Sequence, residues 1–184
     1  MKIDPVSGLL NVAKYVPTQH CDARPPNTTI DLVVIHGISL PPAEWTTSFI
    51  EAFFCGRLNV SAHPYFATLA QLQVSAHLLI DRRGEIIQFV PFMLRAWHAG
   101  QSVFQGRSQC NDFSIGIELV GTDDIPYEPI QYQQLAKIIA LLRARYPAIL
   151  DRVVGHSTIA PGRKTDPGLA FDWHYLSTLE PSHQ

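Results

Sequence analysis

The sequence contains no uncharged apolar stretch near the roughly 20 residues that a membrane-spanning helix needs. Residues 1–17 also lack the apolar run of a secretory signal peptide, because Asp4 and Pro5 interrupt them. These two absences argue against an integral membrane protein. They predict a soluble, cytoplasmic protein that has no membrane partner.

An excess of one charge is also lacking. The 184 residues include 14 Lys and Arg against 16 Asp and Glu, a formal net charge of −2. Without a basic excess, binding of a phosphate backbone is not expected, so nucleic acid is a poor candidate partner. With 46% hydrophobic and 16% charged residues, the composition predicts one compact domain over residues 1–184, and we expect a monomer. We expect its core between about residue 28 and residue 180.

Cysteine is scarce, with only three residues at positions far apart: Cys21, Cys55 and Cys110. That number excludes a metal site of four cysteines, and an odd, widely spaced set does not fit a disulfide framework. We interpret each cysteine as a reduced thiol that packs as a small hydrophobic side chain.

Short runs rich in Val, Ile and Leu predict the strands of a buried sheet. We place them at residues 31–36, 76–80, 85–90, 114–120 and 152–156. The second and third runs flank the turn Asp81–Gly84, a pattern that predicts a β-hairpin. The first strand is expected to end at His36.

Helices are predicted between these strands. Residues 129–146 have apolar side chains at i, i+3 and i+4 spacing and precede Pro147, which is typical of an amphipathic helix that ends there. Shorter helices are expected within 48–54 and within 172–179, where Asp172 would cap the first turn. Together the elements predict an α/β fold in which helices flank a central mixed sheet.

Residues 155–168 form a segment rich in Gly and Pro that holds His156, Lys164 and Asp166. Pro167 biases Asp166 toward an extended backbone, in which residues two apart point the same way. We therefore expect the side chains of Lys164 and Asp166 to face one site.

An imidazole and a carboxylate are good zinc ligands, but a zinc site needs at least one more. We assign this place to His36, because it ends a buried strand and is followed by Gly37, which allows a tight turn beside a ligand. Together with His156 and Asp166 it would leave the fourth position of a tetrahedral ion to water. This arrangement is typical of a catalytic zinc site.

Glu118 is a carboxylate within an apolar strand, where Ile117 and Leu119 occupy the opposite face. Its burial is costly unless it has a partner or a chemical role. Gly116 lies on the same face and would leave space for a ligand. A single buried His or Glu is more often structural than catalytic, so the functional reading depends on the whole set.

Several motifs together resemble the type-2 N-acetylmuramoyl-L-alanine amidases, a family that includes phage amidases and peptidoglycan-recognition proteins. They are Val34-Ile-His36, Ser75–Ile80, Ala96-Trp-His-Ala-Gly100, Asn111–Leu119 and Gly155–Gly168. The resemblance covers nearly the whole chain. It is greatest to the cytoplasmic members that hydrolyse 1,6-anhydro-N-acetylmuramyl-L-alanine during cell-wall recycling.

By this resemblance His36, His156 and Asp166 match the zinc ligands of the family. Glu118 matches its catalytic glutamate, and Lys164 matches the lysine that stabilises the transition state. The resemblance therefore implies a zinc-dependent amidase whose substrate is an anhydro-muropeptide.

The segments 41–76 and 95–112 fit no regular period and are predicted to be binding loops. We expect substrate contacts from Tyr65, His77, Trp97 and His98. Trp97 offers a flat face for a sugar ring. The two histidines would either bond to the substrate or support the metal ligands.

The stem peptide raises a further question. This chain has Gln73 and Gln109 where related sequences often have Arg, which binds carboxylates with two hydrogen bonds. Arg107 is an alternative ligand for the peptide carboxylates.

Two other functions fit parts of the pattern. A zinc-containing sensor would bind muropeptides without cleaving them, but it would need neither Glu118 nor Lys164. A phage-type amidase would act on the intact cell wall. The missing export signal argues against this function.

Overall fold

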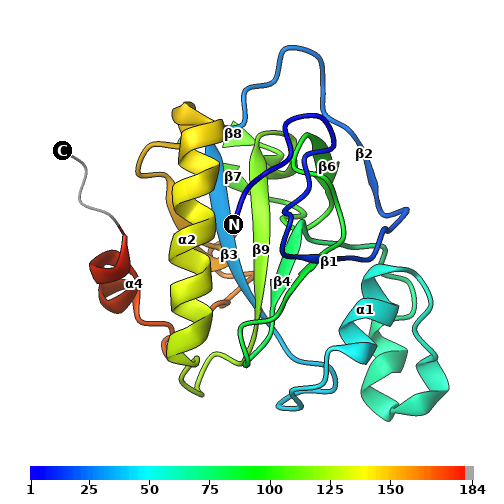
Figure 1. Ribbon diagram of the computed structural model, residues 1–184. Helices are drawn as coiled ribbons and strands as arrows, with labels where there is room; N and C mark the ends of the chain where they lie inside the picture. Colours follow the sequence, from blue (N-terminus) through cyan, green and yellow to red (C-terminus); the bar gives the residue numbers. More distant parts are fainter. Residues whose placement is uncertain (181–184) are drawn as a thin grey trace.

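A six-stranded sheet runs through the computed structural model, which describes residues 1–180 (Figure 1). Its strands lie in the order β1 (Lys14–Tyr15), β5 (Ile86–Gln88), β4 (Leu78–Ile80), β9 (Ser114–Val120), β3 (Leu32–Ile38) and β10 (Val153–Gly155). Strands β4, β9, β3 and β10 are parallel, whereas β5 is antiparallel to β4. Two small antiparallel pairs join β2 (Cys21–Ala23) to β6 (Leu94–Ala96) and β7 (Val103–Phe104) to β8 (Arg107–Ser108).

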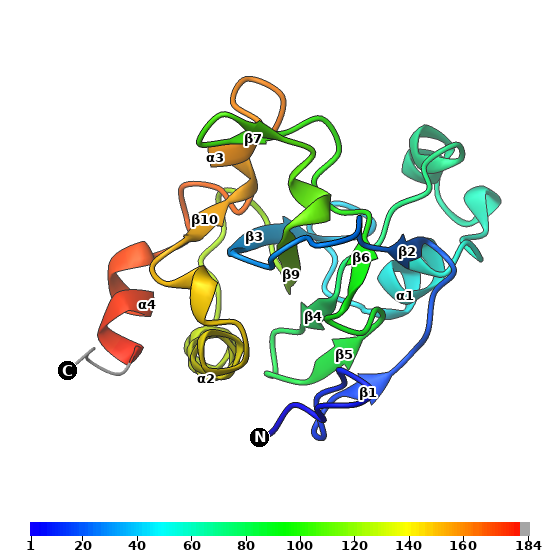
Figure 2. The same ribbon diagram turned by 90° about the horizontal axis from the view of Figure 1, so that it is seen from above.

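The helices are α1 (Ser48–Phe54), α2 (Pro129–Arg145), α3 (His156–Ile159) and α4 (Trp173–Leu179). Short 3₁₀ helices occur at Val60–Ala62, Pro64–Leu69, Cys110–Asp112 and Pro147–Ile149. Helices α2 and α4 cover one face of the sheet, and α1, α3 and the loops around β6 and β7 lie beyond the other (Figures 1 and 2). Among residues 1–180, no helix has the length and apolar character to cross a membrane.

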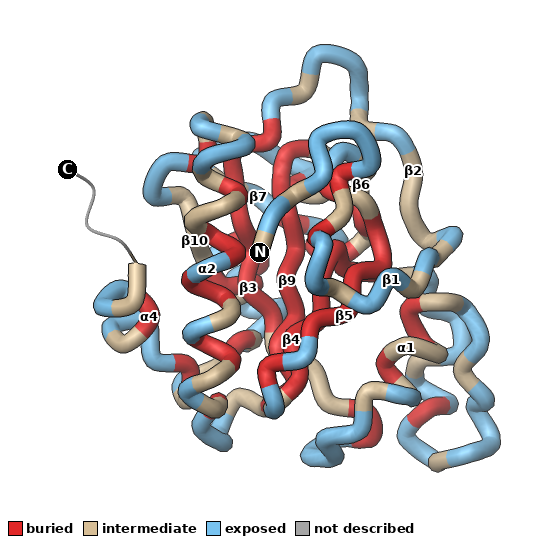
Figure 3. Tube along the Cα trace, viewed as in Figure 1, coloured by how far each residue is buried: buried red, intermediate tan, exposed pale blue. Residues whose placement is uncertain are grey.

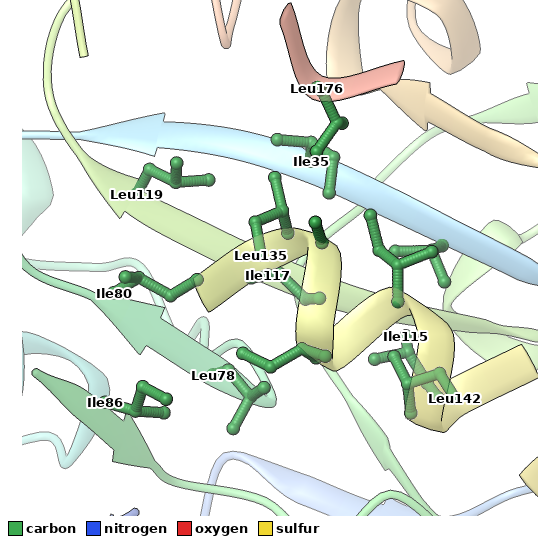
Figure 4. Close-up of a cluster of buried hydrophobic side chains, with 14 of the residues drawn as sticks. Ile35, Leu78, Ile80, Ile86, Ile115, Ile117, Leu119, Leu135, Leu142 and Leu176 are labelled. Atoms are coloured by element: carbon green, nitrogen blue, oxygen red, sulfur yellow. The ribbon is translucent and has the colours of Figure 1, made fainter. Parts of the chain in front are cut away.

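Helix α2 starts at a capping box, in which Glu128 and Gln131 each bond to the backbone of the other, and at Pro129. Its apolar stripe packs against the sheet, where Leu135 and Leu142 lie over side chains of β3 and β9 (Figure 4). Burial of such a stripe stabilises the fold by about 1.5–3 kcal/mol per large side chain.

The alternation of side chains along β3 decides which residues reach the functional face. Val33 and Ile35 join the core under α2. Leu32 and Val34 point to the other face, where they pack into a second apolar cluster, and His36 follows them by the period of two. Both faces are buried over the central strands β3, β4 and β9 (Figure 3).

A third apolar cluster joins the sheet to the lobe that contains α1 and the 3₁₀ helices that follow it. Phe54 packs edge-on against Phe89 with ring centroids 5.2 Å apart, and Phe49 packs edge-on against Phe66 at 5.0 Å. These aromatic contacts hold the lobe beside the sheet and so fix one wall of the cavity described below.

The predicted α/β fold is confirmed, as are the hairpin of β4 and β5 and the helices α1, α2 and α4. Asp172 caps α4 as expected, since its Oδ1 accepts from the Tyr175 amide at 2.8 Å. The expected end of the first strand at His36 is wrong, because β3 continues through Gly37 to Ile38 in register with β9. Segment 41–76 is also more regular than predicted, since two 3₁₀ helices fold within it.

Candidate active site and metal centre

A cavity of about 490 Å³ opens where β3, β9 and β10 end. Its lining includes all five residues that the sequence assigned to chemistry: His36, Glu118, His156, Lys164 and Asp166. The carboxyl ends of parallel strands are where α/β sheets place their ligands, because the loops that follow diverge there.

Three of these residues converge on one point. The Nδ1 atoms of His36 and His156 lie 3.0 Å apart, and each is 3.1 Å from Oδ2 of Asp166. A tetrahedral zinc ion with bonds of roughly 2.0–2.1 Å holds its ligand atoms about 3.4 Å apart. Two imidazole nitrogens and a carboxylate oxygen at this spacing therefore suit a zinc ion after a small outward shift.

The pairing of strands brings the two histidines together. Strand β10 lies beside β3 with Gly155 opposite Ile35, and the residue that follows each of these two is a histidine of the site. His156 is also the first residue of α3. The chain then returns to the site because the Ser157 amide donates to the backbone carbonyl of Asp166 at 3.0 Å.

Tyr127 holds the returning loop. Its hydroxyl donates to the carbonyl of Pro167 at 2.9 Å, directly after Asp166. A Cβ atom at Gly37 would lie 2.2 Å from this hydroxyl, and one at Gly121 would lie 2.3 Å from the ring. Gly37 therefore makes room for Tyr127 within a continuous strand, instead of forming the tight turn that the sequence suggested.

The proton positions also suit a cation. Nε2 of His156 lies 3.3 Å from the carbonyl of Ala99. Because a carbonyl oxygen can only accept, Nε2 carries the proton and Nδ1 presents its lone pair to His36 and Asp166. Burial lowers the pKa of His36 to about 4, although the adjacent Asp166 carboxylate opposes this shift, so this imidazole is neutral at pH 7.

Asp166 remains a carboxylate in this cluster. Its burial alone would raise its pKa, but the neighbouring imidazoles of His156 and His36 outweigh that effect and hold the pKa well below its usual value. Neutral imidazoles and an ionised carboxylate are the protonation states in which these side chains bind metal.

Glu118 is buried beside this cluster, with 9% of the residue exposed. Its Oε2 atom has no hydrogen-bond partner among the residues that the structure describes. Burial raises the pKa of Glu118 well above its usual value, the negative charge of Asp166 raises it further, and the positive charge of Lys164 opposes the rise. A carboxyl group in this state takes up a proton more readily than an exposed one, which suits it to proton transfer.

Lys164 is exposed at the cavity and lines it together with Asp166, as their spacing of two predicted. Its ammonium group is the positive charge that opposes the rise in the pKa of Glu118.

The four residues predicted to contact substrate divide into two pairs. Tyr65 and His98 line the cavity. Trp97 is outside its lining: its Nε1 donates to Asp22 at 3.2 Å, and its ring stacks on His20. His77 is fully buried, so its place does not support a direct contact with substrate.

His77 joins three strands. Its Nδ1 accepts from the Gly116 amide at 3.0 Å, and its Nε2 donates to the Leu94 carbonyl at 3.1 Å. The space over Gly116, which the sequence suggested for a ligand, contains the His98 ring, since a Cβ atom there would lie 2.4 Å from it. Arg107 bonds to Asp31 and covers the Phe113 ring, and it is outside the cavity lining.

Much of the cavity wall had no signal in the sequence. An apolar side comes from the α1 lobe and the segment after it, with Phe53, Phe54, Leu69, Leu72 and Val74. Ser39, Ser75, Thr122 and Asp123 add polar groups. Apart from Ser75, which begins the motif Ser75–Ile80, these residues belong to no recognised motif, and only the folded chain brings them to the histidines.

Comparison with known proteins identifies the family of this chain. Residues 26–169 match the family model described as N-acetylmuramoyl-L-alanine amidase. The chain belongs to this family. The amidase is 57% identical over 175 residues to the 1,6-anhydro-N-acetylmuramyl-L-alanine amidase AmpD of Salmonella typhimurium strain SL1344, across 95% of this chain and 94% of that relative. Its predicted membership and amidase activity are thereby confirmed.

Solved structures give the same result. A crystal structure of a selenomethionine AmpD derivative superposes with a TM-score of 0.95 at 54% identity. The match covers 98% of this chain and 100% of the AmpD chain. The amidase AmiD of E. coli, solved with the substrate anhydro-N-acetylmuramic acid-L-Ala-D-γ-Glu-L-Lys, superposes with a TM-score of 0.59 at 32% identity. That match covers 85% of this chain and 60% of AmiD.

Proposed function

We propose that this amidase hydrolyses the bond between 1,6-anhydro-N-acetylmuramic acid and L-alanine in muropeptides. Zinc is its cofactor, and cytoplasmic peptidoglycan recycling is its setting. The convergence of His36, His156 and Asp166 beside the buried Glu118 is the observation that carries the proposal. The name of the AmpD relative and the substrate in the AmiD structure support the choice of substrate.

The metal ligands in this proposal are the two histidine Nδ1 atoms and Oδ2 of Asp166. A zinc ion bound there would polarise the scissile carbonyl and lower the pKa of a water ligand to about 7. The protein contributes the ligand geometry, because the pairing of β3 with β10 and the Tyr127 hydroxyl bond hold all three side chains in place.

Glu118 acts as the base and then as the acid. Its unpartnered Oε2 atom is free to accept the proton of the attacking water. The raised pKa lets the carboxyl group keep this proton until the L-alanine nitrogen leaves and takes it. The same carboxyl group thus serves both halves of the hydrolysis.

Lys164 stabilises the negative charge that develops on the carbonyl oxygen during attack. It faces the cavity from the same loop as Asp166, so its ammonium group is close to the reacting bond. A fixed positive charge at this place lowers the barrier because the charge of the substrate oxygen grows in the transition state.

Tyr65 and the apolar side of the cavity provide substrate contacts away from the reacting bond. Tyr65 is 38% exposed at the cavity, and its ring is able to pack on a sugar while its hydroxyl bonds to a polar group. Leu69 and Leu72 on the same wall offer apolar surface for the acetyl or lactyl methyl groups.

The test is the product formed from anhydro-muramyl tripeptide, analysed by mass spectrometry. We expect free tripeptide and anhydro-N-acetylmuramic acid from zinc-loaded protein, and intact substrate from protein treated with a chelator. Addition of zinc should restore cleavage. Intact substrate in every arm, together with measurable binding, would instead identify a sensor.

A second arm compares this fragment with intact peptidoglycan sacculi under the same conditions. Recycling predicts that the soluble anhydro fragment is cleaved much faster per bond. Equal or faster release of peptides from the sacculi would favour a phage-type amidase.

A further inference from the structure

A chain of hydrogen bonds leads from the metal ligand His36 away from the cavity. Nε2 of His36 lies 3.0 Å from Nδ1 of His98, and Nε2 of His98 lies 3.1 Å from the Ser114 hydroxyl oxygen. The chain ends where this hydroxyl donates to the carbonyl of Cys110 at 2.5 Å. All these groups are buried, and Ser114 has no exposed surface.

The last link fixes the direction of every other link. A carbonyl oxygen only accepts, so the single hydroxyl proton of Ser114 points to Cys110. The Ser114 oxygen must then accept from Nε2 of His98. A neutral imidazole carries one N–H, so Nδ1 of His98 is bare and accepts from Nε2 of His36.

The consequence reaches the metal site. Because the proton of His36 is on Nε2, its Nδ1 lone pair points toward His156 and Asp166. The Ala99 carbonyl fixes His156 in the same way. Three acceptor atoms, about 3 Å apart with no proton among them, repel one another and favour a cation at their centre.

The fold holds His98 firmly in this chain. Gly116 leaves the space that its ring occupies. The amides of His98 and Ala99 both donate to the side-chain oxygen of Asn111, at 3.0 and 2.8 Å. The ring therefore has little freedom to turn away from His36.

We propose that His98 and Ser114 are positioning residues, which fix the tautomer of His36 so that its Nδ1 atom is always ready to bind the metal ion. The identity of the metal as zinc rests on the function proposed above. Neither residue touches the reacting atoms in this account, and His98 is not needed as a donor to the substrate.

Ser114→Ala removes the anchor of the chain. His98 is then free to carry its proton on Nδ1, which faces Nε2 of His36. Two N–H groups cannot bond to each other, so the proton of His36 moves to Nδ1, the metal-binding nitrogen. Loss of a group that orients a metal ligand typically weakens metal binding about 10- to 100-fold. We expect a loss of zinc affinity in this range, with kcat near the wild-type value once zinc is saturating.

Ser102→Ala is the matched control. Ser102 is also buried, and its hydroxyl accepts from the Cys110 amide at 3.1 Å, but it has no link to His98. Both variants lose a buried serine hydroxyl beside Cys110. We expect only Ser114→Ala to lower zinc affinity, measured by competition with a chromogenic chelator.

His98 itself allows a finer comparison. A glutamine side chain has an acceptor oxygen and a donor nitrogen, so His98→Gln can keep both links and their direction. His98→Met fills similar space without either link. We expect His98→Gln to keep zinc affinity within a few-fold of wild type and His98→Met to lose at least about 10-fold.

The decisive readout is ¹⁵N NMR of the imidazoles in metal-free protein, which identifies the protonated nitrogen of each ring and requires no activity. Wild type should show His36 protonated on Nε2, and Ser114→Ala should show a mixture. A wild-type His36 protonated on Nδ1 would overturn the inference, as would unchanged zinc affinity in both Ser114→Ala and His98→Met. If the wild-type tautomer is as expected but zinc-loaded protein cleaves no muropeptide, only the proposed function fails.

Discussion

His36 and Glu118 occupy directly paired positions on the neighbouring parallel strands β3 and β9. Their side chains therefore emerge side by side on the face of the sheet opposite α2. A shift of the pairing by one residue would turn one of them into the core, so the register that buries the apolar face also places the metal ligand beside the acid. Catalytic geometry here follows from sheet formation.

Glu118→Gln tests the acid in this pair. The amide keeps the shape of the side chain but cannot accept the proton of water, so we expect kcat to fall about 10²-fold or more. Zinc content should remain that of wild type, because the three ligands are unchanged. If zinc-loaded Glu118→Gln has the same kcat as wild type, Glu118 has no part in the mechanism.

The same variant should make the metal-free protein more stable. A carboxyl group whose pKa is raised on folding contributes stability that is present below its unfolded pKa of about 4.3 and is lost as pH rises through the folded value. At pH 7 Glu118 is therefore destabilising, and its replacement should add on the order of 1–3 kcal/mol. Urea unfolding at pH 4 and pH 7 checks this, and a gain that is larger at pH 4 would contradict it.

Lys164→Ala tests the stabilisation of the developing oxyanion. We expect kcat to fall about 10²-fold, with a smaller change in KM, because the charge acts mainly in the transition state. Lys137→Ala, an exposed lysine on α2, is the control and should behave as wild type. If the two variants have equal kinetics, Lys164 has no role in the chemistry.

Gly37 and Tyr127 should be strongly coupled. Gly37→Ala places a methyl group 2.2 Å from the Tyr127 hydroxyl and should cost about 1–3 kcal/mol of stability. Tyr127→Phe removes that hydroxyl and its bond to Pro167, at a cost of about 1 kcal/mol. The double variant should be about as stable as Tyr127→Phe alone, because the next nearest atoms to the new methyl group are 3.5 Å away. Costs that simply add in urea unfolding would show that the two residues do not interact.

Asp166→Asn tests the carboxylate ligand. The amide lacks the negative charge that balances the metal ion, so we expect dialysed protein to contain far less than one zinc per chain by elemental analysis. Asp151→Asn, at an exposed position away from the cavity, should keep its zinc. Equal zinc content in both variants would mean that the metal is bound elsewhere.

Local sequence patterns predicted much of this fold. The β-branched run in β3 and the apolar periodicity of α2 each place a whole element, and β9 has the predicted bounds. Strands β1, β2, β6, β7 and β8 were not predicted, because each is short and lies in no run rich in Val, Ile and Leu. Periodicity needs a longer stretch to be detectable.

The site shows the same division. His36, His156 and Asp166 were predicted from residue types and from the family resemblance, and the structure brings them together. The function of Gly37 was misread, because nothing beside it in the sequence indicates that Tyr127, 90 residues away, needs the space. The anchor Ser114 was likewise missed, since its importance depends on a hydrogen-bond chain that only the folded structure assembles.

Activity as a function of zinc added to metal-free protein tests the central claim most directly. If His36, His156 and Asp166 form the one catalytic metal site, cleavage of anhydro-muramyl tripeptide should rise in proportion to added zinc and stop rising at one zinc per chain. Full cleavage by protein held in excess chelator, or a plateau at a different ratio, would contradict the account.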